Sequence, residues 1–279
     1  MNKSHNVQPE KPLRLSVNHL LSHVFWIILA GTLLGLLLWV ATMPQVVSAL
    51  WPHSRGLVRI SSQEDFWADQ KPKAEEKAFI AYCVEIAKAR NQHLFGDLKS
   101  KPRCIFLFKP QNITHFLYKA PVKIASTFYF GRPFIIFSMY KLTPDISSHE
   151  FCHAELYHRL GGSLKQPSLP QWFDEGLALQ VDGRYTQAEQ YYNLEHKNLP
   201  QPKELASAQD FYRNPDETHL RNHLLSYFWV KQWLKRHKQS GLNKLIQNIK
   251  KEQVNFDTLV LKNHSVGSHV TKPRKVKIL

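Results

Sequence analysis

The fold is decided by the stretch TPDISSHEFCH, residues 143–153. Thr143 is a favoured helix N-cap, Pro144 fits the first helical position, and Asp145 places an acid at the positive end of the helix dipole. Together these signals predict a helix that begins just before His149. We expect this helix to cover Thr143–Leu160.

Two histidines of this helix are spaced for metal binding. His149 and His153 are four residues apart, so they lie one turn apart on the same helix face. Each can offer an imidazole nitrogen to one zinc ion, at about 2.0–2.1 Å. Glu150 lies about 100° around the helix from His149, beside the ligand face but not aimed at the metal. That placement suits a base that acts on metal-bound water.

A third ligand is expected from the stretch LPQWFDEGLA, residues 169–178. A catalytic zinc site needs three protein ligands and one open position. We predict a second helix over Pro170–Val181, and Glu175 on it can supply a carboxylate oxygen. The predicted metal ligands are therefore His149, His153 and Glu175.

The pattern HExxH followed by W-x-x-E-G-L-A resembles the gluzincin group of metallopeptidases. The modest chain length resembles the minimal form of that group, the peptidase MA-like or minigluzincin domain. The resemblance covers residues 101–252 and is most specific over His149–His153 and Trp172–Ala178. It implies an α+β domain with a small mixed sheet packed on the HExxH helix and a mainly helical C-terminal half. It also implies a zinc cofactor, a peptide or protein substrate, and a substrate-binding strand edge above the helix.

Further site residues follow from this resemblance and from the general chemistry of metal sites. His223 stands where we align the family's usual tyrosine, and either His223 or Tyr227 could donate a hydrogen bond to developing negative charge. Both also fit an ordinary buried side chain. Either Asp174 or Asp182 could hold the second nitrogen of a ligand imidazole, as metal sites usually require.

The other predicted elements frame this site. A buried strand is expected at Cys104–Phe108, and two further strands are expected on either side of a tight turn at Gly131. The second of these, Pro133–Tyr140, is the candidate edge for substrate. The first of the two strands is expected at Val122–Phe130. Five further helices are expected at Gln63–Asn91, Gln187–Glu195, Glu204–Tyr212, Thr218–His237 and Gly241–Lys251.

The N-terminal part contains an apolar stretch without charges, residues 24–43. As a helix it would span roughly 30 Å, the thickness of a bilayer's hydrocarbon core. We predict a transmembrane helix there, after a short segment 1–23. The stretch Val47–Ala49 resembles a signal-peptide cleavage site, so a cleaved leader is the alternative. A single anchor of this kind predicts an extracytoplasmic catalytic domain, periplasmic in a Gram-negative bacterium.

The amino-acid composition limits the classes of binding partner and the state of the cysteines. The 279-residue chain has a formal charge of +15, which favours anionic surroundings or forms a solvated basic surface. The sequence lacks an RNA-binding signature and Cys/His finger spacing, so no nucleic-acid partner is expected. Three cysteines are too few for a disulfide scaffold. Cys83 and Cys104 could pair in an oxidising compartment, or both could be buried free thiols.

These observations predict a membrane-anchored zinc peptidase with a catalytic domain over residues 51–262 and a disordered basic tail over 263–279. Glu150 would be its general base. Two alternatives remain open from the sequence. One is a zinc hydrolase that acts on a non-protein amide, and the other is a non-catalytic, membrane-tethered module with a basic binding face.

Overall fold

A computed structural model describes residues 17–41, 50–117, 124–162, 169–185, 201–213 and 218–251. These residues belong to two compact units, 1–47 and 48–279. In the first unit, helix α1 covers Val17–Ala41 and exposes all side chains of Leu21–Leu38. This helix is long and apolar enough to cross a membrane, and a signal sequence would pass the same test. The predicted tail 263–279 lies outside the described residues.

The second unit contains a five-stranded mixed sheet with the order β1-β2-β3-β5-β4. β3 pairs in parallel with both β2 and β5, while β1 and β4 pair antiparallel with their neighbours. β4 is therefore an edge strand and β5 is an internal one. The strands are β1 Val58–Arg59, β2 Phe66–Ala68, β3 Arg103–Leu107, β4 Ala125–Tyr129 and β5 Pro133–Ser138.

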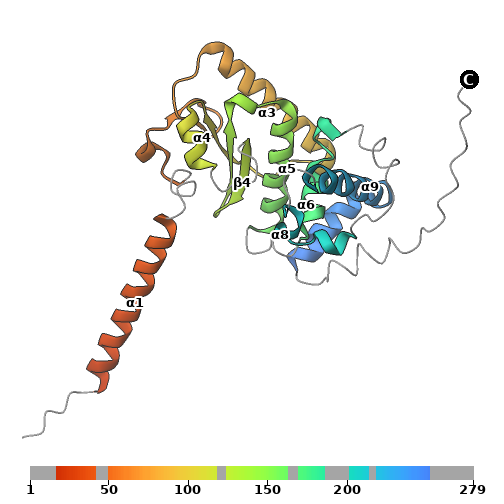
Figure 1. Ribbon diagram of the computed structural model, residues 1–279. Coiled ribbons are helices and arrows are strands. Elements are labelled where there is room, and N and C mark those ends of the chain that lie inside the picture. Colours follow the sequence, from red (N-terminus) through yellow and green to blue (C-terminus); the bar gives the residue numbers. More distant parts are fainter. Residues whose placement is uncertain are drawn as a thin grey trace, which may run out of the picture. The chain divides into compact units, whose positions relative to one another are not determined.

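Side chains of β5 alternate between two apolar layers, as the two-residue period of a strand requires. Ile135 and Phe137 face a core shared with α3 (Ala74–Phe95) and α5 (Pro144–Leu160). Phe134 and Ile136 join a second core with α4, Pro110–Phe116, on the opposite face. The sheet thus has helices on both faces (Figure 1), which explains why every residue of β5 is buried.

The helical half packs on α5 from the side away from the sheet. It consists of α6 (Gln171–Ala178), α8 (Ala208–Phe211) and α9 (Thr218–Lys250), joined in one large apolar core. Trp172 of α6 packs edge-to-face on Trp229 of α9, with ring centroids 5.6 Å apart. The described residues also form short 3-10 helices: η1 Pro52–Arg55, η2 Met139–Lys141, η4 Gly183–Tyr185 and η5 Pro202–Leu205.

Several sequence predictions about these elements are confirmed. The strand at Cys104–Phe108, the turn at Gly131 and the HExxH helix all occur, and Gly131 has the positive φ of 69° that a tight turn needs. The two helices expected at Thr218–His237 and Gly241–Lys251 both occur: α9 is divided by a kink at Lys238, whose φ of 56° and ψ of −171° are not helical. All three cysteines are buried and free, so Cys83 and Cys104 are not bridged.

Other predictions are wrong. The helix expected over Gln63–Asn91 begins only at Ala74, because Phe66 belongs to β2, which pairs with β3. The expected helix Glu204–Tyr212 is divided into η5 and α8. The strand at Pro133–Tyr140 is not the sheet edge, because β4 pairs along its outer side. The expected helix Gln187–Glu195 lies outside the described residues.

Candidate metal centre

The helix that carries the HExxH motif is capped as its sequence predicts. The Thr143 hydroxyl accepts a hydrogen bond from the Ile146 amide at 3.2 Å, and Pro144 is the first helical residue. The helix ends at Gly161, which has a left-handed φ of 91°. These local signals fix where α5 begins and ends, and its packing against the sheet and α6 leaves His149, Glu150 and His153 lining one cavity.

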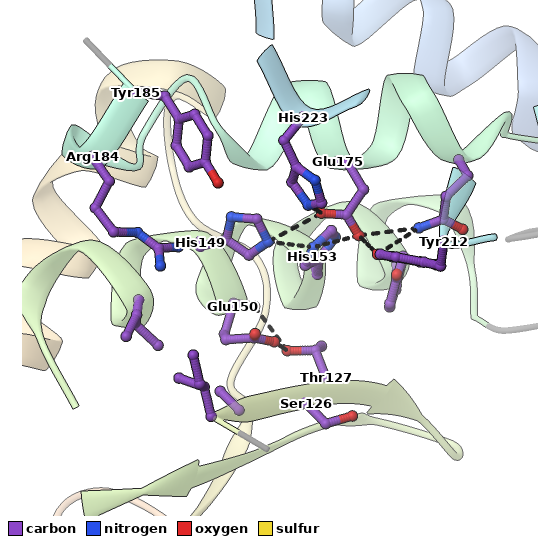
Figure 2. A pocket seen from close by; sticks show the side chains of 15 residues that line it. Ser126, Thr127, His149, Glu150, His153, Glu175, Arg184, Tyr185, Tyr212 and His223 are labelled. Atoms are coloured by element: carbon purple, nitrogen blue, oxygen red, sulfur yellow. Dashed lines mark hydrogen bonds and ion pairs between the residues drawn. The ribbon is translucent and has the colours of Figure 1, made fainter. Parts of the chain in front are cut away.

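Three side chains meet at one point in this cavity (Figure 2). The Nε2 atoms of His149 and His153 are 3.1 Å apart. A carboxylate oxygen of Glu175 lies 3.3 Å from His149 Nε2, and the other lies 3.9 Å from His153 Nε2. One ligand atom from each residue falls within 4.8 Å of the other two, so the group could hold a metal ion.

Glu175 is held in place by neutral donors. The Tyr212 hydroxyl donates to its Oε1 at 2.5 Å, and the Gln171 amide donates to the same oxygen at 3.0 Å. His223 Nε2 lies 3.6 Å from the other oxygen. Burial raises the pKa of Glu175, but His149 and His223 outweigh it and hold that pKa well below its usual value. The carboxylate is therefore ionised and oriented before any metal binds.

Each of the two histidines has its own carboxylate partner. Asp174 Oδ1 lies 2.8 Å from His153 Nδ1, and Asp182 Oδ2 lies 3.4 Å from His149 Nδ1. The second contact is an ion-pair distance without hydrogen-bond geometry. The sequence left Asp174 and Asp182 as alternatives, and the structure places one behind each imidazole. Such partners fix the ring orientation and raise ligand basicity.

The charge around His149 is strongly negative. Burial lowers the pKa of His149, but contacts with Asp182 and Glu175 outweigh it and raise this pKa to about 10. The fully buried side chain of Asp182 is itself paired with Arg184, and its pKa falls to about 2. Without metal, the excess negative charge is balanced by a proton on the imidazole, which a divalent cation would replace.

Glu150 is positioned by the edge strand. The Thr127 hydroxyl of β4 donates to Glu150 Oε2 at 2.6 Å and also lies 3.1 Å from the Glu150 main-chain oxygen. Figure 2 shows the carboxylate lying between the ligand histidines and β4. This places a carboxylate beside the potential metal position without making it a ligand.

No family model, curated protein or solved structure matches this chain. The chemistry of the site therefore follows from its own residues.

The cavity has a volume of about 320 Å³ and is bordered by β4, α5, α6 and η4. His223 lines it, as expected from the sequence, and stacks near Tyr185 with ring centroids 6.2 Å apart. Tyr185 and Tyr212 also line it, and the sequence analysis did not single out either tyrosine. Both lie on short turns far along the chain from the HExxH motif, so no spacing rule could have pointed to them.

Tyr227 lies elsewhere. Its ring packs with Leu179, and the Lys231 ammonium lies 5.3 Å from the ring centroid. It borders a second groove between α3 and α9 but not the metal cavity. Among the described residues, the tyrosines that line this cavity are Tyr157, Tyr185 and Tyr212, and the Tyr157 hydroxyl donates to Asp174.

Proposed function

We propose that this protein is a zinc-dependent peptidase of the minigluzincin type. The observation that carries the proposal is the meeting of His149, His153 and Glu175 within 4.8 Å, with Glu150 in the same cavity. Two imidazole nitrogens and one carboxylate oxygen form the donor set of many catalytic zinc sites, which keep a fourth position open. The buried partners Asp174 and Asp182 complete the support that such ligands need.

Zinc in this position would act as a Lewis acid that makes water more acidic and polarises a substrate carbonyl. The chain's own residues then move the protons. Glu150 accepts a proton from the attacking water and passes it to the leaving amine. The Thr127 hydroxyl keeps the Glu150 carboxylate oriented toward the cavity.

Negative charge that develops on the carbonyl oxygen needs donors on the side of the cavity opposite β4. His223 and Tyr185 lie there, and Figure 2 shows the Tyr185 hydroxyl pointing toward His149 and His223. Either group can donate a hydrogen bond to that oxygen. Tyr212 is less free to do so, because its hydroxyl is engaged with Glu175.

The substrate would bind along β4. This strand is the sheet edge nearest the cavity, and its residues Ala125, Ser126 and Thr127 line the cavity wall. Exposed strand edges bind extended peptides through main-chain hydrogen bonds. A peptide in this position would bring a scissile bond past Glu150, which is why we favour a peptide over other amides. We further propose that α1 anchors the enzyme to a membrane, with the catalytic unit outside the cytoplasm.

The test uses the full chain in lipid nanodiscs, with a quenched fluorescent casein substrate and metal analysis. Wild type should contain about one zinc per chain and hydrolyse casein, and a chelator should stop hydrolysis. Glu150→Gln should keep zinc and lose at least about a thousandfold in turnover, because the base is gone. Glu175→Ala should lose zinc. Glu75→Gln, an exposed carboxylate on α3, is the matched control and should change neither.

The outcomes separate the alternatives. Zinc binding without casein hydrolysis, but with hydrolysis of small non-peptide amides, would replace the peptidase with another zinc hydrolase. Absence of both zinc and hydrolysis would leave a non-catalytic binding module. Full turnover by Glu150→Gln would remove that residue from its assigned role.

A further inference from the structure

A second groove, of about 1030 Å³, lies behind the loop that follows α6. Three segments form it: the C-terminal half of α3, residues 180–183, and α9 around its bend at Lys238. Ligand pockets usually have volumes of about 300–1,000 Å³, so the space is large enough for a small molecule. No step of the proposed hydrolysis uses this groove.

The walls of the groove are apolar and its polar groups are mostly occupied. Leu94, Val181 and Leu234 supply apolar surface. The side-chain amide of Gln180 already donates to the main-chain oxygens of Gly176 and Tyr227. A peptide would bring main-chain N–H and C=O groups that find few free partners here, and leaving them unpaired is costly. A plain hydrocarbon chain has no such requirement.

The rim of the groove is basic. Arg90, His93 and Lys238 line it, and Asp182 is the one carboxylate among the described lining residues. Asp182 is already paired with Arg184, and Arg90 is tied to Asp145 at 2.6 Å. Lys238 is exposed and has no ion-pair partner among the described residues. An anionic head group therefore finds an exposed ammonium, and an imidazole on the same rim.

The bend that presents Lys238 is held in place. Its backbone lies at φ 56° and ψ −171°, a conformation that costs free energy for any residue with a side chain. The side chain of the next residue, Gln239, donates to the main-chain oxygens of His93 and Leu94, at 3.4 and 3.3 Å. These hydrogen bonds tie the bend in α9 to the end of α3. The basic rim therefore keeps a fixed position relative to the apolar walls of the groove.

We propose that this groove binds a monocarboxylate amphiphile, an unbranched fatty acid of medium chain length. The carboxylate lies at Lys238 and His93, and the hydrocarbon chain lies against Leu94, Val181 and Leu234. The bound chain rests on residues 180–183, the segment that carries Asp182 toward His149. The proposal does not depend on peptidase activity.

The test is photo-crosslinking of the full chain in lipid nanodiscs with a diazirine analogue of decanoic acid, followed by peptide mapping. Labels are expected on peptides from α3 and α9 that border the groove. Decanoate should compete, whereas decanol, which lacks the charge, should compete about tenfold less well. Labelling of the apolar helix α1 by probe dissolved in the bilayer gives an internal reference.

Two variants decide the role of the ammonium group. Lys238→Glu keeps a side chain at the strained backbone position and reverses its charge. This variant should reduce labelling of the groove about tenfold or more. Lys235→Glu makes the same charge change on an exposed site of α9 outside the groove and should leave labelling unchanged. If Lys238→Glu does not fold, Lys238→Gln replaces it. Labels confined to α1, equal competition by decanol, or undiminished labelling of a folded Lys238 variant would each overturn the proposal.

Discussion

Asp174 joins two side chains of α5: its Oδ1 lies 2.8 Å from His153 Nδ1, and its Oδ2 accepts the Tyr157 hydroxyl at 2.8 Å. All three residues are buried. Burial lowers the pKa of His153, but the Asp174 carboxylate outweighs it and raises that pKa. The carboxylate therefore holds His153 with Nε2 turned toward His149 and Glu175, which is the orientation that a metal ligand would need.

Replacing this carboxylate should weaken metal binding. Asp174→Asn removes the negative charge behind His153, and we expect zinc affinity to fall by about 10–100-fold. Tyr157→Phe keeps the charge and removes one hydrogen bond, so its effect should be smaller. Competition with a fluorescent chelator measures both affinities. Equal affinity of Asp174→Asn and wild type would show that the carboxylate does not support the ligand.

Thr127 should matter for turnover but not for metal. Its hydroxyl lies 2.6 Å from Glu150 Oε2, and no ligand atom of the metal group is involved. Thr127→Val keeps the shape of the side chain and frees the carboxylate to rotate, so kcat should fall about tenfold through loss of orientation. Thr127→Ser keeps the hydroxyl and should restore most of kcat. The assay is casein hydrolysis at saturating substrate, together with zinc content.

A low kcat in both Thr127 variants would assign the effect to packing of β4 instead. Unchanged kcat in Thr127→Val would show that Glu150 needs no help from this strand.

The two helices of the metal group were predictable from sequence because their determinants are local. The N-cap Thr143, the following proline and the four-residue histidine spacing fix one helix face. The helix α6 that carries Glu175 was predictable from its own apolar pattern, whereas its meeting with the two histidines was expected from the resemblance of the W-x-x-E-G-L-A stretch. Both helices depend on neighbours within a few residues, so they can be derived without knowing the tertiary fold, but the packing of α6 on α5 cannot.

The sheet edge and the cavity wall were not predictable in this way. β5 is a more continuous apolar run than β4, but the pairing of β5 with β3, which decides that β4 is at the edge, is a contact between segments far apart in the sequence. The short strand β2 exists because it pairs with β3, so its local sequence was mistaken for the start of a helix. Tyr185 and Tyr212 reach the cavity through the path of the chain in space, which no local spacing encodes.

Gly176 should tolerate no side chain. It follows Glu175 on α6, and a Cβ at this position would lie 2.4 Å from the main-chain oxygen of Ser226 and 2.6 Å from Val230 Cγ2. Neither the backbone of α9 nor a fully buried valine can move freely. Gly176→Ala should therefore lower the free energy of unfolding by about 1–3 kcal/mol, despite the higher helix propensity of alanine.

The measurement for Gly176→Ala is thermal unfolding followed by circular dichroism, with zinc content as a second readout. The control is Ala208→Gly at the start of α8, which changes propensity without a close contact between helices. A stabilised Gly176→Ala would mean that α6 and α9 are further apart than the structure places them.

Asp65 should make stability depend on pH in the acid range. Its carboxylate accepts hydrogen bonds from Trp67 Nε1 at 2.6 Å and Arg103 Nε at 2.9 Å, and Arg132 lies 2.9 Å away. Burial raises the pKa of Asp65, but these partners outweigh it and hold the pKa below its ordinary value of 3.8. Because the folded pKa is depressed, the stabilisation is fully present above the unfolded pKa and is lost as pH falls through the folded one.

Asp65→Asn should therefore be less stable than wild type at pH 7, and the difference should shrink below about pH 4. Urea unfolding followed by tryptophan fluorescence at pH 7, 5 and 3 measures it. Asp97→Asn replaces an exposed carboxylate, and its difference from wild type should stay small at all three pH values. A deficit in Asp65→Asn that is equally large at pH 3 and pH 7 would show that the lost stability comes from packing around β2 and not from the ionised carboxylate.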